Sequence, residues 1–124
     1  MKILFVTSEC APFSKSGGLA DVAFSLPPAL TAAGNEIAII TPLYQCVKEK
    51  YGKKLKSVWA GTVRLGWREH YCGLLRGKLG DVTVWFVDNE DFFLRPKPYG
   101  YDDDKLRFAW FSRAVIDLFD SRVD

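Results

Sequence analysis

The sequence predicts an α/β domain in which a parallel core sheet carries an appended β-meander. The first observation is a strand, a glycine-rich loop, a helix and a second strand in succession within residues 2–42. This order is typical of a right-handed crossover between two parallel strands. The second observation is a change to two-residue periodicity in residues 55–88, which indicates antiparallel strands or hairpins. Helical periodicity then returns near residue 104.

Length and composition agree with one globular domain of this class. The chain has 124 residues, of which 48% are hydrophobic and 26% charged, and a chain of this size buries roughly two thirds of its unfolded surface. No apolar run approaches the ~20 residues of a membrane helix. The first run, residues 3–6, is also shorter than the ~7–15 residues of a signal-peptide core. We therefore expect a cytoplasmic protein without a membrane partner.

Cysteine, histidine and charge patterns exclude several kinds of site. Cys10, Cys46 and Cys72 form no C-x-x-C pair and His70 is the one histidine, so neither a disulfide framework nor a metal site is indicated. These four side chains are interpreted as structural. Residues 1–80 hold eleven Lys and Arg against five Asp and Glu. This excess favours an anionic ligand but is too mild for a nucleic-acid partner.

The elements of the βαβ unit follow from residue type and spacing. Residues 2–8 are short, apolar and β-rich, which predicts a buried strand. A loop follows, and the helix begins near Gly17 or Gly18. Gly34 is predicted to end the helix as a left-handed cap. Residues 36–42 predict the second buried strand.

The predicted helix contains one apolar stripe and two prolines. The stripe is typical of a helix that packs one face on a core. Its members are Leu19, Val22, Ala23, Leu26, Leu30 and Ala33. Pro27 and Pro28 remove backbone donors and clash with the preceding turn, so we expect a kink or a restart of the helix there.

The remaining elements combine strands, a long loop and a final helix. Residues 43–54 predict a polar connection or a short helix, and residues 55–88 predict a meander or hairpins punctuated by glycines. Residues 88–104 form a loop rich in aromatic residues, prolines and acids, and a helix is predicted from about Asp104 to Asp120. Its best apolar face is Leu106, Ala109, Trp110, Val115 and Leu118. Sheet or core packing is expected for the four tryptophans, Trp59, Trp67, Trp85 and Trp110.

The segment K-S-G-G-L-A-D-V, residues 15–22, predicts an anion site. A helix N-terminus has unpaired N–H groups and the positive end of the helix dipole. After a parallel strand it lies at the sheet edge where ligands of open α/β folds bind. Gly17 and Gly18 would let phosphate oxygens approach the amides, and Lys15 would add a mobile charge. A nucleotide pyrophosphate suits this arrangement best; the alternative is a tight turn beside a solvated lysine.

Two separated blocks of the chain also carry the motifs of a known family. Residues 4–22, L-F-V-T-S-E-C-A-P-F-S-K-S-G-G-L-A-D-V, contain K-x-G-G-L and continue into L-P-P-A-L and A-A-G-N-E-I-A-I-I-T-P-L-Y. Residues 84–114 contain the pattern F-x-D-N, then Y-G, then R-F-x-x-F-x-R-A. Both blocks resemble bacterial glycogen synthases and plant starch synthases, and the resemblance covers nearly the whole chain.

The resemblance implies part of the N-terminal, Rossmann-like lobe of a two-lobed GT-B glycosyltransferase. Such enzymes transfer glucose with retention from a nucleotide sugar, typically ADP-glucose, to the non-reducing end of an α-1,4-glucan. No metal or other cofactor is implied, because fixed protein donors stabilise the departing phosphate charge. On this basis residues 1–124 are expected to be a truncated N-terminal domain without its C-terminal nucleotide-binding lobe. We expect the chain alone to be inactive, and the choice between ADP-glucose and UDP-glucose stays open.

The resemblance further implies ligand roles for six residues, although it assigns no catalytic residue within the chain. Lys15 matches a phosphate-contacting lysine, and Gly17 and Gly18 match the loop against the donor. The other three residues are acids of the motif and a tyrosine on the sugar side of the cleft: Glu9, Asp21 and Tyr99.

Several alternatives stand beside these assignments. Asp21 would favour the helix dipole without any ligand, Glu9 could bond nearby loop amides, and Tyr99 could be a packed loop aromatic. The chain as a whole could be a stand-alone module that binds a nucleotide, a phosphate or a glucan without catalysis. A nicotinamide oxidoreductase is disfavoured, because the second strand ends in Thr41-Pro42 and not in the acid that would hold ribose hydroxyls.

Overall fold

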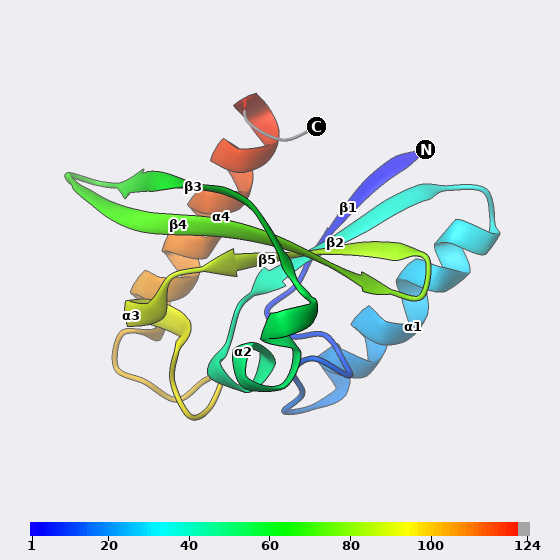
Figure 1. Ribbon diagram of the computed structural model, residues 1–124, viewed down its shortest axis with the longest axis horizontal. Coiled ribbons are helices and arrows are strands. Elements are labelled where there is room, and N and C mark those ends of the chain that lie inside the picture. Colours follow the sequence, from blue (N-terminus) through cyan, green and yellow to red (C-terminus); the bar gives the residue numbers. More distant parts are fainter. Residues whose placement is uncertain (122–124) are drawn as a thin grey trace.

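One five-stranded sheet organises the computed structural model, which describes residues 1–121 (Figure 1). The elements are β1 Lys2–Val6, α1 Gly18–Ala32, β2 Glu36–Pro42, α2 Gln45–Tyr51, the 3-10 turn η1 Gly52–Lys54, β3 Lys56–Leu65, β4 Arg68–Leu79, β5 Val82–Asp88, α3 Glu90–Phe93 and α4 Asp104–Ser121. The last three residues of the D-S-R-V-D terminus lie outside the described part of the chain.

The sheet has the strand order β1-β2-β5-β4-β3. Strands β1, β2 and β5 are parallel, and β4 is antiparallel to both β5 and β3. The predicted α/β class with a parallel core and antiparallel additions is therefore confirmed. One assignment changes, because β5 belongs to the parallel core and only β3 and β4 form the addition. The carboxyl ends of β1, β2 and β5 consequently meet at one edge of the sheet.

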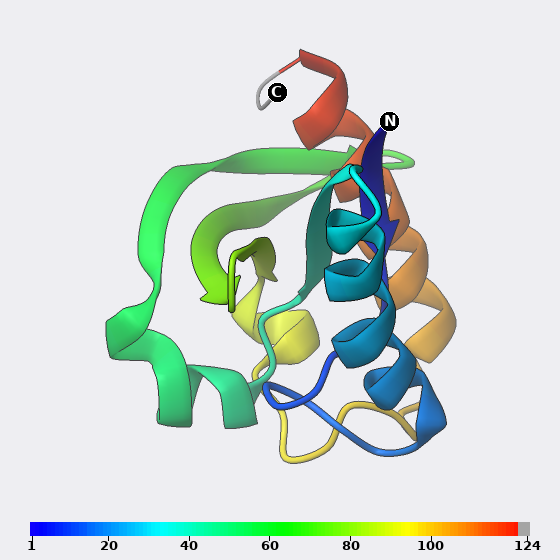
Figure 2. The ribbon, with the colours of Figure 1, turned by 90° about the vertical axis from the view of Figure 1, so that its right-hand side faces the viewer.

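Helices lie on both sides of this sheet. Figures 1 and 2 place α2 on one side and α4 on the other, with the strands between them. Helix α4 packs on β3, where the indole nitrogen of Trp110 donates to the carbonyl of Val63 at 3.2 Å. The largest apolar side chains of the core come from the sheet, from the connection after β2, and from α3 and α4: Trp110, Tyr44, Phe86, Phe93, Ile39, Ile40, Leu43, Leu74 and Leu118.

Helix α1 is continuous through Pro27 and Pro28, so of the predicted kink or restart, the restart does not occur. The nitrogen of Pro27 has no hydrogen for the carbonyl of Ala23, four residues earlier. The Cys10 sulfur lies 3.7 Å from that oxygen and 3.4 Å from the Ala11 carbonyl, and either oxygen can accept the single thiol hydrogen. Burial raises the pKa of Cys10 to about 11, which keeps the thiol protonated as a donor. A side chain from the preceding loop thus lies beside the carbonyl that loses its helical hydrogen bond to Pro27.

The buried face of α1 differs from the predicted apolar stripe. Small residues and one proline face the sheet, namely Ala20, Ala23 and Pro27. The larger apolar side chains Leu19, Val22, Phe24 and Leu26 are 41–49% exposed. Periodicity identified a helix correctly and its face in part, since Ala23 of the predicted stripe is buried and Leu30 is partly buried against the core. The larger members of the stripe are exposed, because short side chains allow the helix backbone to approach the sheet closely.

Gly34 forms the predicted cap of α1, whereas strand β1 is less buried than predicted. Gly34 caps α1 with a φ of 94°, and the amides of Gly34 and Asn35 donate to Thr31 and Leu30, as predicted for a left-handed cap. Strand β1, predicted to be buried, is an edge strand and is only partly covered, with Val6 49% exposed. An edge strand has a neighbour on one side only.

The predictions for the tryptophans and for α4 were correct in part. Trp85 and Trp110 are buried and Trp59 is partly buried, as expected, but Trp67 is 80% exposed. It lies in the tight turn between β3 and β4, where Gly66 has a φ of 63°, and a turn residue has no sheet face to pack on. Along α4 the buried residues are Arg107, Trp110, Phe111, Ala114, Val115 and Leu118, whereas the expected Leu106 and Ala109 are exposed.

Candidate functional site

Three connections meet at the carboxyl edge of the parallel strands. They are residues 7–17 after β1, residues 43–44 after β2 and residues 89–103 after β5. Figures 1 and 2 both show the first and third of these loops together at the lower end of the molecule, beside the start of α1. Ligands of open α/β sheets bind at this edge, and all six residues assigned a ligand role lie on these connections or in the first turn of α1.

Glu9 is buried, and its carboxylate is used within the first loop. It is 3% exposed, and its Oε2 accepts hydrogen bonds from both the amide and the hydroxyl of Ser16 at 2.8 Å. The hydroxyl of Thr7 donates to the Glu9 carbonyl at 2.7 Å. Glu9 therefore bonds a loop amide, as its structural alternative anticipated, and this contact fixes the start of the glycine segment.

Lys15 and Asp21 form an ion pair beside that segment. The ammonium Nζ lies 2.8 Å from Asp21 Oδ1, and the two side chains are 55% and 58% exposed. Exposed pairs of this kind contribute at most about 1 kcal/mol. The lysine can therefore exchange this carboxylate for a more highly charged anion at little cost.

Gly17 and Gly18 are exposed at the start of α1. Gly17 is the N-cap residue and makes no side-chain cap hydrogen bond; its φ of −169° is extended backbone that any residue adopts. A Cβ built on either glycine would meet no atom within 4 Å. Neither packing nor backbone conformation therefore requires glycine at these positions.

Tyr99 reaches from the third loop to the end of β1. Its hydroxyl lies 2.6 Å from the Ser8 hydroxyl, and Tyr44, just after β2, donates to the Ser8 carbonyl at 2.6 Å. Burial raises the pKa of Tyr99, and the negative charge of Glu9 raises it further, against a lowering by the Ser8 hydrogen bond. The phenol is thus neutral near pH 7. Its ring also packs on Phe108, with centroids 5.7 Å apart.

Four polar residues of this edge were not found by sequence reasoning: Ser8, Ser16, Tyr44 and Arg107. Two of them adjoin assigned residues, because Ser8 precedes Glu9 and Ser16 precedes Gly17. Tyr44 follows the carboxyl end of β2, and that position is itself a signal. Arg107 stands in the R-F-x-x-F-x-R-A block, which marks it as part of a motif without indicating its contacts.

Two cavities lie at opposite edges of the sheet. A polar pocket of about 480 Å³ opens beside the end of β5 and includes Lys48, His70, Asp88 and Glu90 in its lining. Lys48 and Glu90 form an ion pair of 2.7 Å, and burial raises the pKa of the Asp88 carboxyl. A larger cavity of about 760 Å³ lies at the amino edge, near Lys2. It contains none of the six assigned residues, so cavity size does not mark the candidate site.

The described part of the chain contains neither a candidate metal cluster nor a candidate membrane helix. Within residues 1–121, no three His, Cys, Asp or Glu side chains are grouped so that they could hold a metal ion. Over the same range, no helix has the length and apolarity needed to cross a bilayer. His70 packs against Phe92 with ring centroids 5.0 Å apart, which agrees with its structural interpretation.

The fold and this edge define a class of protein, an open α/β domain with a glycine-rich loop at the start of its first helix. Comparison with known proteins identifies the particular family. The model of the starch synthase catalytic domain matches residues 2–124. The chain therefore belongs to the starch synthase catalytic domain family, which confirms the resemblance found in the sequence.

Individual relatives agree with this assignment. The chain is 51% identical over 117 residues to a glycogen synthase of Bacillus subtilis and covers 24% of that protein. It is 47% identical over 124 residues to a glycogen synthase of Streptococcus pneumoniae and covers 26% of it. The solved catalytic domain of starch synthase IV from Arabidopsis thaliana, bound to ADP and acarbose, matches 95% of this chain with a TM-score of 0.85 and 30% identity. The chain spans about a quarter of the length of these relatives.

Proposed function

We propose that this chain is the donor-side part of the N-terminal lobe of a glucan synthase. The parent enzyme would be a cytoplasmic, retaining glycosyltransferase that moves glucose from ADP-glucose to the non-reducing end of an α-1,4-glucan. Residues 1–124 would then be a truncated N-terminal domain, with the C-terminal nucleotide-binding lobe outside this chain. The names of the relatives support the reaction. The ADP and acarbose bound to the Arabidopsis domain support a nucleotide and a glucan-type ligand.

One observation carries the proposal: neither packing nor a left-handed φ requires glycine at Gly17 and Gly18, yet two adjacent glycines lie beside Lys15 at a helix N-terminus. A bare backbone is useful where a ligand must approach the amides closely. A diphosphate group fits such a place, because it takes both the first-turn N–H groups and the lysine charge.

The residues present would act on the leaving group during transfer. Negative charge accumulates on the phosphate as the glucosyl–oxygen bond breaks, and preorganised donors stabilise that charge. Lys15 would leave Asp21 for the phosphate, adding a charge-assisted hydrogen bond. Glu9 would keep the loop in place by holding Ser16, so that the donors need no reorganisation. Tyr99 would contribute a neutral hydroxyl on the sugar side.

Alanine at Gly17 or Gly18 tests this proposal directly. Because an added methyl group meets no protein atom, thermal unfolding should show a gain of up to about 1 kcal/mol for Gly18→Ala in the helix. Gly17→Ala should lose about 1 kcal/mol or less, since alanine is a poorer N-cap residue than glycine. In the full-length enzyme, kcat/KM for ADP-glucose should fall at least ~10-fold, since a blocked phosphate contact is worth about 1.5–3 kcal/mol. Gly52→Ala is the matched control. Unchanged kcat/KM in both variants would remove the main support for a phosphate site here.

The isolated chain provides a second test. We expect residues 1–124 alone to bind ADP weakly and to transfer no glucose, because the proposed site needs contacts from the second lobe. Calorimetric titration with ADP and an assay with ADP-glucose and glycogen measure both properties. Tight ADP binding without turnover would indicate a stand-alone binding module instead, and turnover by the isolated chain would contradict the proposed division of the active site.

A further inference from the structure

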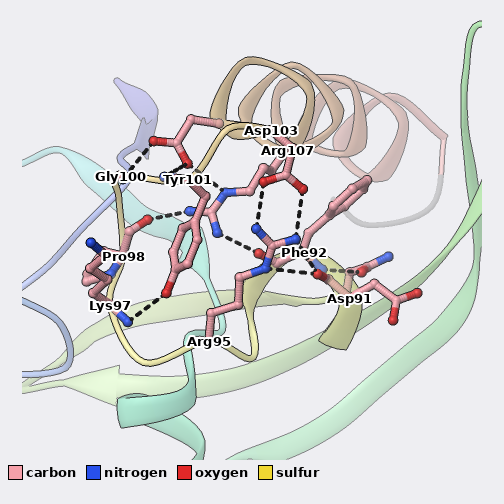
Figure 3. A network of polar contacts seen from close by, with 11 residues as sticks. Asp91, Phe92, Arg95, Lys97, Pro98, Gly100, Tyr101, Asp103 and Arg107 are labelled. Carbon is pink, nitrogen blue, oxygen red and sulfur yellow. Dashed lines mark hydrogen bonds and ion pairs between the residues drawn. The ribbon is translucent and has the colours of Figure 1, made fainter.

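The loop between α3 and α4 carries Tyr99 and covers a fully buried arginine, Arg107. This side chain is 0% exposed and extends from the first turns of α4 into the space under the loop (Figure 3). Removing a guanidinium ion from water is costly unless it is paired and hydrogen-bonded. Arg107 is therefore expected to have a structural role other than filling the core, because an uncharged side chain could fill the same space at lower cost.

Arg107 joins two separate parts of the main chain. Its Nη1 donates to the carbonyl of Phe92 at 2.7 Å, and its Nη2 donates to the carbonyl of Pro98. Its Nε lies 3.3 Å from the carboxylate of Asp104. Aromatic rings surround the guanidinium, with centroids 4.9–5.4 Å from its central carbon: Phe93, Tyr101 and Phe108. The arginine thus ties the end of α3 to the residue directly before Tyr99.

Further polar contacts hold the same loop from its outer side (Figure 3). Arg95 binds both carboxylate oxygens of Asp103, at 2.6 and 2.8 Å. The carboxylate of Asp104 accepts hydrogen bonds from the amides of Gly100 and Tyr101 at 2.9 and 3.2 Å. The loop is therefore fixed at both of its ends, and Arg107 provides the fully buried attachment.

A chain of contacts continues from this loop to the glycine segment. Tyr99 follows Pro98 in sequence, and its hydroxyl pairs with Ser8 at 2.6 Å. Ser8 adjoins Glu9, whose carboxylate holds the amide and hydroxyl of Ser16 at 2.8 Å. Ser16 directly precedes the exposed glycines. A displacement of Pro98 would therefore reach the first turn of α1 through two hydrogen-bonded steps.

We propose that Arg107 is a positioning residue for the donor loop. By holding the carbonyls of Phe92 and Pro98 together, it places Tyr99 against Ser8 and thereby keeps Glu9 and Ser16 in the arrangement that presents the glycine amides. Arginine suits this task because its planar fork reaches two carbonyls at once, which the single ammonium of lysine cannot do in the same geometry. The role rests on the proposed function, since it concerns the same phosphate site.

The test uses the full-length enzyme with three single variants and one double variant: Arg107→Lys, Tyr99→Phe, Arg113→Met and Arg107→Lys/Tyr99→Phe. Arg113 is the matched control, because it lies on the same helix but is 53% exposed and pairs with Asp117. Three quantities are measured: Tm, kcat/KM with ADP-glucose and glycogen, and the hydrogen-exchange rate of the Ser16 amide.

Arg107→Lys should keep the fold but lower kcat/KM by roughly 10-fold or more, since small misplacements can cost up to ~100-fold. Arg113→Met should stay within about twofold, as expected for an exposed pair. The Ser16 amide should exchange faster in both Arg107→Lys and Tyr99→Phe. Because both substitutions interrupt one chain of contacts, the double variant should lose less than the product of the two single losses.

Two results would overturn the positioning role. One is a Ser16 amide that exchanges at the wild-type rate in Arg107→Lys; the other is a double variant whose losses simply multiply. Hydrogen exchange does not require turnover, so it separates this inference from the proposed function. A wild-type enzyme that transfers no glucose from ADP-glucose would refute the function, while the exchange rates would still decide the role of Arg107.

Discussion

Replacing Trp110 by alanine is expected to destabilise the domain by about 3–5 kcal/mol. The indole is fully buried and packs against Phe92 and Phe93, with ring centroids 5.5 and 6.3 Å away. Its nitrogen donates to Val63 at 3.2 Å, so the substitution leaves both a cavity and a β3 carbonyl without this partner. Because typical domains have only about 5–15 kcal/mol of stability, urea unfolding should show a large fall in the transition midpoint.

The matched control is Trp67, which lies in the turn between β3 and β4. Trp67 is 80% exposed, although Arg68 lies over its ring at 4.6 Å. Trp67→Ala should change the free energy of unfolding by no more than about 0.5 kcal/mol, as is usual for surface positions. Similar losses for the two substitutions would contradict the division between a buried and an exposed tryptophan.

Replacing Lys15 by alanine or glutamine in the full-length enzyme should lower kcat/KM for ADP-glucose by about 10- to 150-fold. This range corresponds to the loss of about 1.5–3 kcal/mol for a charge-assisted phosphate contact. The Tm should change little, because the Lys15–Asp21 pair is more than half exposed and exposed pairs contribute little stability. Steady-state kinetics with varied ADP-glucose measure the first quantity, and thermal unfolding measures the second.

Lys54, an exposed lysine of the η1 turn, provides the control for Lys15. Lys54→Ala removes the same charge from a turn that contains none of the six assigned residues. It should leave kcat/KM unchanged within about twofold, because salt screens the interaction between distant exposed charges. An enzyme that keeps full kcat/KM after Lys15→Ala would show that this ammonium makes no useful contact with the donor.

Most of the order of elements and several of their ends were predictable because their signals are local. The exception is α3, a short helix within residues 88–104, which were predicted to be a loop. The β-rich runs, the Gly34 cap and the two-residue periodicity depend on neighbouring residues, and the structure reproduces them. The face of α1 was not predictable in this way. Leu19, Val22 and Leu26 have the spacing of a buried stripe, but the sheet accepts only the small face with Ala20 and Ala23. Which face packs depends on the depth available between helix and sheet.

In the candidate site, too, some features follow from neighbouring residues in the sequence and others depend on the tertiary structure. The motif at residues 15–22 and the rule that ligands bind at the carboxyl edge were sufficient to select the loop, its lysine and its glycines. The partners of these residues were not predictable. Tyr99 and Ser8 are 91 positions apart in sequence, and no periodicity or motif spacing connects them. The buried attachment of Arg107 depends in turn on the aromatic rings that α3 and α4 bring around it.

The main strands, the limits of α1 and α4 and the place of the proposed anion-binding loop are thus properties that short stretches of this chain encode directly. Burial, ion pairing and the linkage from Arg107 to Ser16 arise only when β1, β5 and α4 are assembled. The physical reason is that conformational preference acts between neighbours in sequence, whereas close packing and desolvation act between whatever residues the fold brings together.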